Sequence, residues 1–228
     1  MQQQSNPELF NLLVEALPLS FLEAMARAVP AIYAEASAEL SASTLIDEQE
    51  MGMLLPHYRR AMLETRMRRD AKAAGLVAVT KSTKNDTAKF SFVDAGRIVL
   101  TASHVAQPNH QPRYAAFRNE HAALNELLEQ GDFFGFPDEP TNGDDGKIYC
   151  YFLYGGEVSK DKITTFEEIA IPAPGGGGYV DHYPLASVLM VVRALNQPAV
   201  EAQLDNAFPV PKQLPKDPKE GMGDGGGA

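Results

Sequence analysis

Residues 97–130, RIVLTASHVAQPNHQPRYAAFRNEHAALNELLEQ, decide the fold class of this chain. The segment 97–105 is apolar on both faces, which is typical of a central strand that is covered on each side. Pro112 then predicts the start of a helix of roughly five turns, because proline is tolerated at the first helical position. The stretch therefore predicts a central strand, a polar loop and a long helix. It also holds three of the chain's five histidines: His104, His110 and His121.

Outward from this stretch, the hydrophobic spacing changes from helical to alternating after Gly75. Helices are predicted before that point, with a kink at Pro30 and a restart at Pro56, because proline removes a backbone donor. The order predicts an α+β protein, in which N-terminal helices precede a β-β-β-α-β-β-α unit with a mixed or antiparallel sheet. Alternating or apolar runs predict strands, in addition to 97–105, at 76–82, 88–92, 147–154 and 166–171.

The same patterns divide the chain into three parts. Residues 1–43 are expected to form an N-terminal helical segment, and residues 44–204 an α+β core domain. Residues 205–228 are rich in Pro, Lys, Asp and Gly, and this composition predicts a disordered tail. The helix predicted at 184–196 is apolar nearly all round, so it is expected to be buried or to form a homodimer interface.

Composition favours a soluble, cytoplasmic protein. The net charge is −10, a single cysteine rules out an internal disulfide, and the longest apolar run, 185–192, is too short to span a bilayer. The first residues lack the basic and apolar regions of a signal peptide. The charge is uneven, however, because residues 56–75 carry a local +4 and the remainder carries −14.

The basic segment 56–75 is the first candidate binding surface. It predicts contact with nucleic acid phosphates or with an acidic protein partner. Some of its charge is expected to be used in ion pairs along the helix, because Arg60, Glu64 and Arg68 follow one another at four-residue spacing. The candidate residues are Arg59, Arg60, Arg66, Arg68, Arg69 and Lys72.

A row of polar side chains on the helix predicted from Pro112 is the second candidate. Arg118, His121 and Asn125 share a face with apolar residues, and buried polar groups need partners. One hypothesis is a small-ligand pocket formed by this row together with His104 and Arg113. The alternative is a hydrogen-bonded network that holds the helix against the sheet.

Residues 45–155 are similar in element order to the core of the PD-(D/E)XK nucleases: a helix, three strands, a helix and a strand. The resemblance implies a metal-dependent nuclease that uses Mg²⁺. For this alternative the candidate catalytic residues in the chain are Asp86, Asp94, His104 and His121. The third strand, 97–103, has neither the acid nor the lysine that the family's D/E-x-K motif requires. The histidines match no zinc motif, so no metal site is predicted from the residues themselves.

No catalytic motif names a reaction. The glycine run 175–178 lacks the lysine of a phosphate-binding loop and is interpreted as a hairpin connection, and Cys150 is interpreted as a small core residue. The sequence favours an intracellular accessory or regulatory protein of bacterial or phage type that binds a protein partner or nucleic acid. A metal-dependent nuclease and a small-ligand sensor are the two alternatives.

Overall fold

Six strands form one sheet in the computed structural model, which describes residues 6–129, 146–158 and 163–197. The predicted tail, 205–228, lies outside the described residues. The strands lie side by side in the order in which they occur along the chain: β1 (Val77–Ser82), β2 (Lys89–Asp94), β3 (Ile98–His104), β4 (Ile148–Val158), β5 (Ile163–Pro172) and β6 (Tyr179–Pro184).

One parallel pair divides this sheet into two antiparallel halves. β3 and β4 run parallel, whereas β1, β2 and β3 form one antiparallel meander and β4, β5 and β6 another. Short turns join antiparallel neighbours, but parallel neighbours need a long crossover. The crossover here contains α4 (Ala116–Ala122), the 3-10 turn η1 (Ala123–Asn125) and α5 (Glu126–Glu129). The predicted α+β class with a mixed sheet is confirmed.

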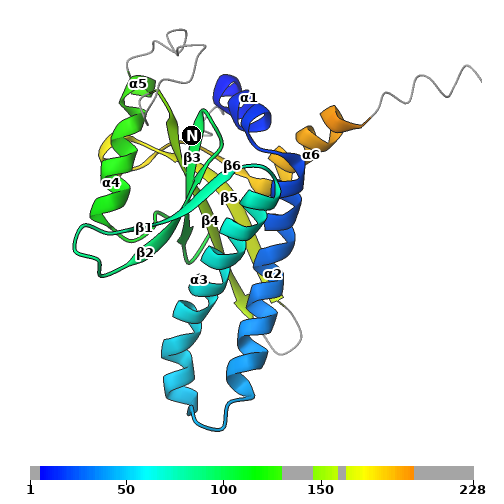
Figure 1. Ribbon diagram of the computed structural model, residues 1–228, viewed down its shortest axis with the longest axis vertical. Helices are drawn as coiled ribbons and strands as arrows, with labels where there is room; N and C mark the ends of the chain where they lie inside the picture. Colours follow the sequence, from blue (N-terminus) through cyan, green and yellow to red (C-terminus); the bar gives the residue numbers. More distant parts are fainter. Residues whose placement is uncertain (1–5, 130–145, 159–162, 198–228) are drawn as a thin grey trace, which may run out of the picture. The chain divides into compact units, whose positions relative to one another are not determined.

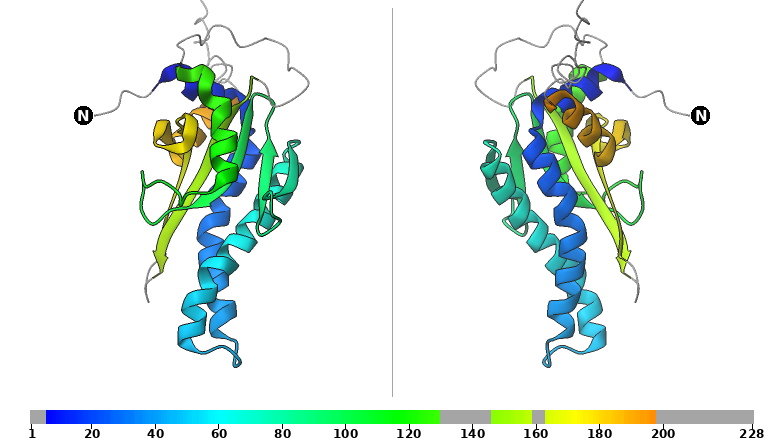
Figure 2. Two further views of the ribbon diagram at one scale, coloured as in Figure 1. Left: turned by 90° about the vertical axis from the view of Figure 1, so that its left-hand side faces the viewer. Right: turned by 90° about the vertical axis from the view of Figure 1, so that its right-hand side faces the viewer.

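Helices cover both faces of the sheet (Figure 1; Figure 2). α4 and η1 lie on one face, packed against β4. A second 3-10 turn, η3 (Pro174–Gly176), connects β5 to β6. The opposite face is covered by four helices: α1 (Pro7–Ala16), α2 (Leu19–Ser41), α3 (Glu48–Ala73) and α6 (Leu185–Asn196).

Side chains at the helix ends explain where α1 and α3 begin. Asn6 Oδ1 accepts hydrogen bonds from the backbone amides of Glu8 and Leu9, and the Asp47 carboxylate accepts one from Glu50. Each cap satisfies amides that the first turn of a helix leaves without partners.

Pro30 and Pro56 lie inside α2 and α3 and neither ends its helix. The predicted kink at Pro30 and restart at Pro56 therefore do not divide these helices. The missing proline amide removes one hydrogen bond, but α2 and α3 pack along each other and bury an apolar face between them.

Two element boundaries differ from those predicted. The helix expected from Pro112 begins four residues later at Ala116, because Ala115 is extended, with φ −151° and ψ 131°. A sixth strand, β6, occupies residues that were assigned to a connection and a helix start. Tyr183 and Pro184 end this strand, and α6 follows directly at Leu185.

The larger of two hydrophobic cores lies between the sheet and the four helices. The described part of the predicted N-terminal segment, α1 and α2, contributes buried side chains to this core together with α3, α6 and the strands. Val93, Leu100 and Cys150 are fully buried on the sheet side, at 0 % exposure. Burial also raises the pKa of the Cys150 thiol, which agrees with its interpretation as a core residue.

A smaller, aromatic core lies on the other face, beneath α4. Phe90 of β2 stacks on Phe117 of α4 with ring centroids 4.1 Å apart. The ring of His121 meets Phe92 and Tyr149 edge-on at 5.3 and 5.4 Å. This core therefore fixes α4 to both β2 and β4.

Asn125 fastens the crossover to the sheet. Its amide nitrogen donates to the backbone oxygens of Tyr149 (3.0 Å) and Pro172 (2.7 Å), and its Oδ1 accepts from the Tyr149 amide (2.8 Å). The side chain is fully buried, at 0 % exposure. One residue thus joins η1 to β4 and to the end of β5.

The last helix is buried on one side only. Leu185, Val188 and Val192 pack into the larger core, whereas Met190 and Leu195 are 66 % and 71 % exposed. The helix predicted at 184–196 is therefore present, and a homodimer through it stays a prediction.

Within the described residues, no single helix is both long and apolar enough to cross a membrane. α1 and α2 are long and apolar enough only when they are taken together, and they are bent by 95° relative to each other.

We expect Asn125→Ala to lower the free energy of unfolding by about 3 kcal/mol, because each buried backbone group left without a partner costs about 1–3 kcal/mol. Urea unfolding followed by circular dichroism measures the change. Asn11→Ala, at an exposed position of α1, is the matched control and should change stability by less than about 0.5 kcal/mol. Equal stability of the two variants would contradict this role for Asn125.

Candidate functional site

β2 separates from β3 part-way along the sheet. The two strands pair only at Val93 with Leu100 and at Asp94 with Val99. β2 nevertheless stays paired with β1 along its whole length. The β1–β2 hairpin therefore diverges from the central strands, and backbone groups of β2 on that side need other partners.

Glu64 of α3 is the partner for one of these groups. The Ser91 amide donates to Glu64 Oε2 (2.5 Å), and the Ser91 hydroxyl donates to the Glu64 backbone oxygen (2.7 Å). Arg68 donates to Ser91 Oγ (2.8 Å), and Arg60 Nε lies 3.9 Å from Glu64 Oε1. α3 is thereby fixed alongside the hairpin.

The Glu64 carboxyl is 6 % exposed. Burial raises its pKa above the ordinary value of 4.5, while hydrogen bonds from Ser91 and the charges of Arg60 and Arg68 act in the opposite direction. The contact between α3 and β2 therefore holds an acidic side chain where water is largely excluded.

An open groove of about 630 Å³ lies between α3 and the β1–β2 hairpin, and we call it the α3–hairpin groove. Three cationic side chains line it, Arg60 and Arg68 from α3 and Lys89 from the hairpin. The buried Glu64 is the one carboxylate in its lining. The remaining hydrogen-bonding side chains of the lining are His57, Thr65, Thr80 and Thr87.

Positive charge is concentrated in the segment of chain that forms both walls of this groove, although only three of its cations line the groove. Residues 56–89 hold nine Lys/Arg and three Asp/Glu, a local charge of +6. Because the whole chain has a charge of −10, the remaining residues carry −16. The groove thus lies in a basic part of an otherwise strongly acidic chain.

Of the six cationic residues predicted to bind a partner, Arg60 and Arg68 line the groove. Arg59 is used inside the fold instead. Its guanidinium lies 4.2 Å from the centre of the Tyr33 ring, and it donates to Ser37 Oγ (3.0 Å). Arg59 therefore joins α3 to α2.

The other three predicted residues lie on α3 outside the groove lining. Arg66 and Arg69 are within 3.7 and 3.2 Å of Asp70, so both have an acidic partner within the helix. Lys72 is exposed in the last turn of α3.

The hairpin wall of the groove was missed from the sequence. Thr80 and Lys89 belong to segments that were predicted as strands, and Thr87 lies between them, in residues 83–87, for which nothing was predicted. The signal was present, because positive charge continues beyond Gly75 in Lys81, Lys84 and Lys89. A charge window extended to residue 89 would have found this wall.

The polar row Arg118, His121 and Asn125 does not form one pocket. Asn125 is the structural link between η1, β4 and β5, and His121 packs among aromatic rings of the smaller core. Arg118 lines a separate small cavity together with Arg113. His104 lies at the exposed end of β3, with its ring 5.6 Å from that of Tyr154.

The four candidate nuclease residues are not brought into one cluster. Asp86 lies in the turn of the hairpin, and Asp94, at the other end of β2, pairs with Lys147 Nζ at 2.6 Å. His104 ends β3 and His121 lies in the smaller core. Across the described segments 6–129, 146–158 and 163–197, no three His, Cys, Asp or Glu side chains are grouped so that they could hold a metal ion.

Comparisons with protein-family models, with curated proteins and with solved structures found no match for this chain. Its function is therefore argued from its own residues and their geometry.

We expect Glu64→Gln to become more stable relative to the wild type as the pH rises. The folded-state pKa of Glu64 is raised, so the folded protein binds this proton more tightly than the unfolded chain does. Ionising Glu64 therefore costs stability, and the cost develops from pH 4.5 upward until the folded-state pKa is passed. Urea unfolding of both proteins across this pH range measures the difference.

This assignment would be contradicted if the stability of Glu64→Gln relative to the wild type stayed constant or fell as the pH rose. Glu64→Ala is the companion variant, because it leaves the Ser91 amide without its acceptor. It should be about 1–3 kcal/mol less stable than Glu64→Gln at every pH, because neither variant has the ionisable carboxyl.

Proposed function

We propose that this chain is a binding protein that holds an acidic segment of a partner protein in the α3–hairpin groove. The observation that carries the proposal is the charge of the groove, whose lining has three Lys/Arg side chains and one buried carboxylate. A concave surface of one charge sign attracts and orients ligands of the opposite sign.

Preorganised guanidinium groups favour carboxylates as the ligand. Arg68 is held by Ser91 Oγ, and Arg60 by Glu64 and the backbone oxygen of Lys89 (3.3 Å). A guanidinium can bind a carboxylate through two parallel hydrogen bonds, and a fixed guanidinium loses less entropy in doing so. Several such contacts along one groove suit a run of Asp or Glu.

The edge of the sheet beside the groove supports a protein partner. β1 pairs with β2 alone, so its other edge has no neighbouring strand among the described residues. Val77 and Val79 on this edge strand are 64 % and 44 % exposed. An extended peptide binds such an edge through its backbone, and alternate side chains then provide specificity.

Nucleic acid is the less favoured ligand. Proteins that bind single strands without sequence preference combine basic grooves with aromatic side chains on which bases stack. The α3–hairpin groove has His57 as its one ring side chain.

A cytoplasmic location remains a prediction, as does self-association through α6.

We expect Lys89→Glu to weaken binding of a fluorescently labelled deca-glutamate peptide about tenfold, which corresponds to about 1.4 kcal/mol. The substitution reverses one charge at the wall of the groove. Fluorescence anisotropy measures the affinity, which should also fall as salt is raised because charges at the groove are screened.

Lys72→Glu is the matched control, because it makes the same charge change on α3 outside the groove lining. It should change the affinity by less than about threefold, since Lys72 is exposed, does not line the groove and is screened by water and salt. An equal loss of peptide affinity in both variants would show that the peptide responds only to the net charge of the protein. This result would contradict binding in the groove. If the protein bound single-stranded DNA more tightly than the peptide, nucleic acid would be favoured as the ligand of the groove and the proposed protein partner would be rejected.

A further inference from the structure

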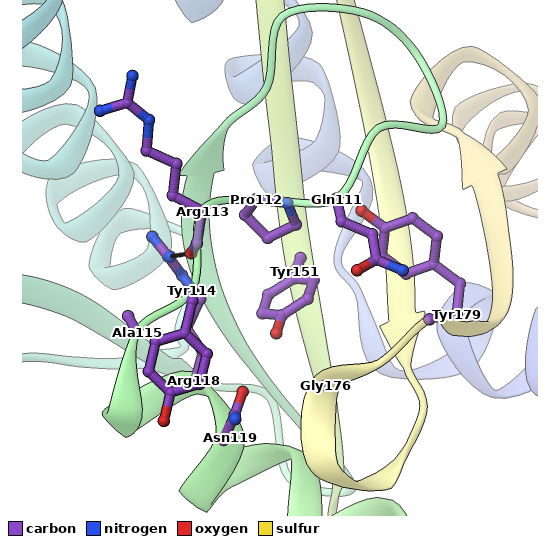
Figure 3. A pocket seen from close by; sticks show the side chains of 11 residues that line it. Gln111, Pro112, Arg113, Tyr114, Ala115, Arg118, Asn119, Tyr151, Gly176 and Tyr179 are labelled. Carbon is purple, nitrogen blue, oxygen red and sulfur yellow. Dashed lines mark hydrogen bonds between the residues drawn. The ribbon is translucent and has the colours of Figure 1, made fainter.

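A second cavity, of about 150 Å³, lies on the face of the sheet opposite the groove. It is enclosed by the loop before α4, by α4 itself, by Tyr151 of β4 and by the glycine-rich connection between β5 and β6. Figure 3 shows Tyr151 in the middle, with Arg118 on one side and Tyr179 on the other. We call it the Tyr151 cavity.

Arg118 is a cation in this cavity with no carboxylate counter-ion among the described residues. Its Nη1 donates to the backbone oxygen of Arg113 (2.5 Å), while its buried Nε has no hydrogen-bond partner. In the part of the chain that the structure describes, no carboxylate lies within ion-pair distance of Arg118. Burial is the main cause that lowers the pKa of this guanidinium.

The Phe117 ring, 5.1 Å from the guanidinium carbon, compensates this charge only in part. A partly desolvated guanidinium without a carboxylate is costly, and an anion bound beside it would remove much of that cost. Arg113 also lines the cavity, although Figure 3 shows its side chain pointing away from Tyr151. Among the residues that the structure describes, no acidic side chain lines this cavity. The electrostatics therefore select a ligand with a negative charge.

The walls specify the rest of the ligand. Tyr114, Tyr151, Tyr179 and Pro112 present flat or rigid apolar surfaces. The volume of about 150 Å³ is that of an engineered apolar cavity that takes up benzene. The space thus fits one six-membered ring.

The glycine-rich connection lies against Asn119 of α4 at Gly176, whose backbone conformation favours glycine. Gly176 has φ +75°, and a Cβ there would lie 2.4 Å from Asn119 Oδ1. The glycine-rich connection therefore approaches α4 closely and brings the Asn119 amide into the lining. This amide and the Tyr151 hydroxyl supply neutral hydrogen-bonding groups beside the ring-sized space.

We infer that the Tyr151 cavity binds a small aromatic carboxylate, a single ring with one carboxylate directed to Arg118. The ring stacks among the tyrosines, and the carboxylate accepts hydrogen bonds from the guanidinium. This site is independent of the α3–hairpin groove, because the two share no lining residue.

Isothermal titration calorimetry with benzoate tests the inference. Wild-type protein should bind benzoate at least tenfold more tightly than benzamide, its neutral analogue, and than acetate, which lacks the ring. Arg118→Met should weaken benzoate binding at least tenfold. Arg27→Met, which removes an exposed arginine on α2, should leave the affinity unchanged.

Tyr114→Ala gives a second test that does not depend on a buried residue, because this side chain is 81 % exposed. It should weaken benzoate binding severalfold while the melting temperature stays the same. Absence of benzoate binding, equal affinity for benzoate and benzamide, or an unchanged affinity in folded Arg118→Met overturns the inference. Inorganic phosphate binding more tightly than benzoate also overturns it, since a plain anion site would then explain Arg118.

Discussion

The parallel pairing of β3 with β4 is the constraint on which the rest of the architecture depends. Parallel neighbours cannot be joined by a tight turn, so the chain must leave the sheet after His104 and return at β4. That excursion places α4 on one face and leaves the other face to α1, α2, α3 and α6. Asn125 makes the arrangement specific, because its three hydrogen bonds join the crossover to two strands at once. The smaller core and the Tyr151 cavity both form beneath this crossover.

A second constraint is the separation of β2 from β3. A sheet that stayed paired along its full length would leave no backbone amide for α3 to bind. Here the Ser91 amide is accepted by Glu64, so that a helix takes the place of a strand as the partner of β2. The same contact sets the distance between the two walls of the α3–hairpin groove. Structural and binding roles are therefore combined within a few residues of α3, as Arg60 and Arg68 also show.

Local patterns were sufficient to predict much of this fold. The alternation of Phe90 and Phe92 and the apolar run in β4 predicted their strands correctly. Gly96, in the turn between β2 and β3, has a positive φ of 77°. β6 was missed because Tyr183 and Pro184 fit a strand end and a helix start equally well. The role of Asn125 depends on which strands lie beneath it, and a helical projection carries no such information. The basic helix was recognised, and the lysines of the hairpin that faces it belong to the same basic stretch of sequence, but which side chains line the groove depends on tertiary packing.

Both walls of the α3–hairpin groove come from one continuous piece of chain, since its lining residues run from His57 to Lys89. Contacts within such a piece close short loops, which lose less entropy than contacts between distant segments. The groove is thus encoded locally, whereas the Tyr151 cavity needs residues from Gln111 to Tyr179. Substitutions elsewhere in the chain can alter the cavity without changing the groove. The two surfaces are in this sense free to evolve separately within a single folded unit.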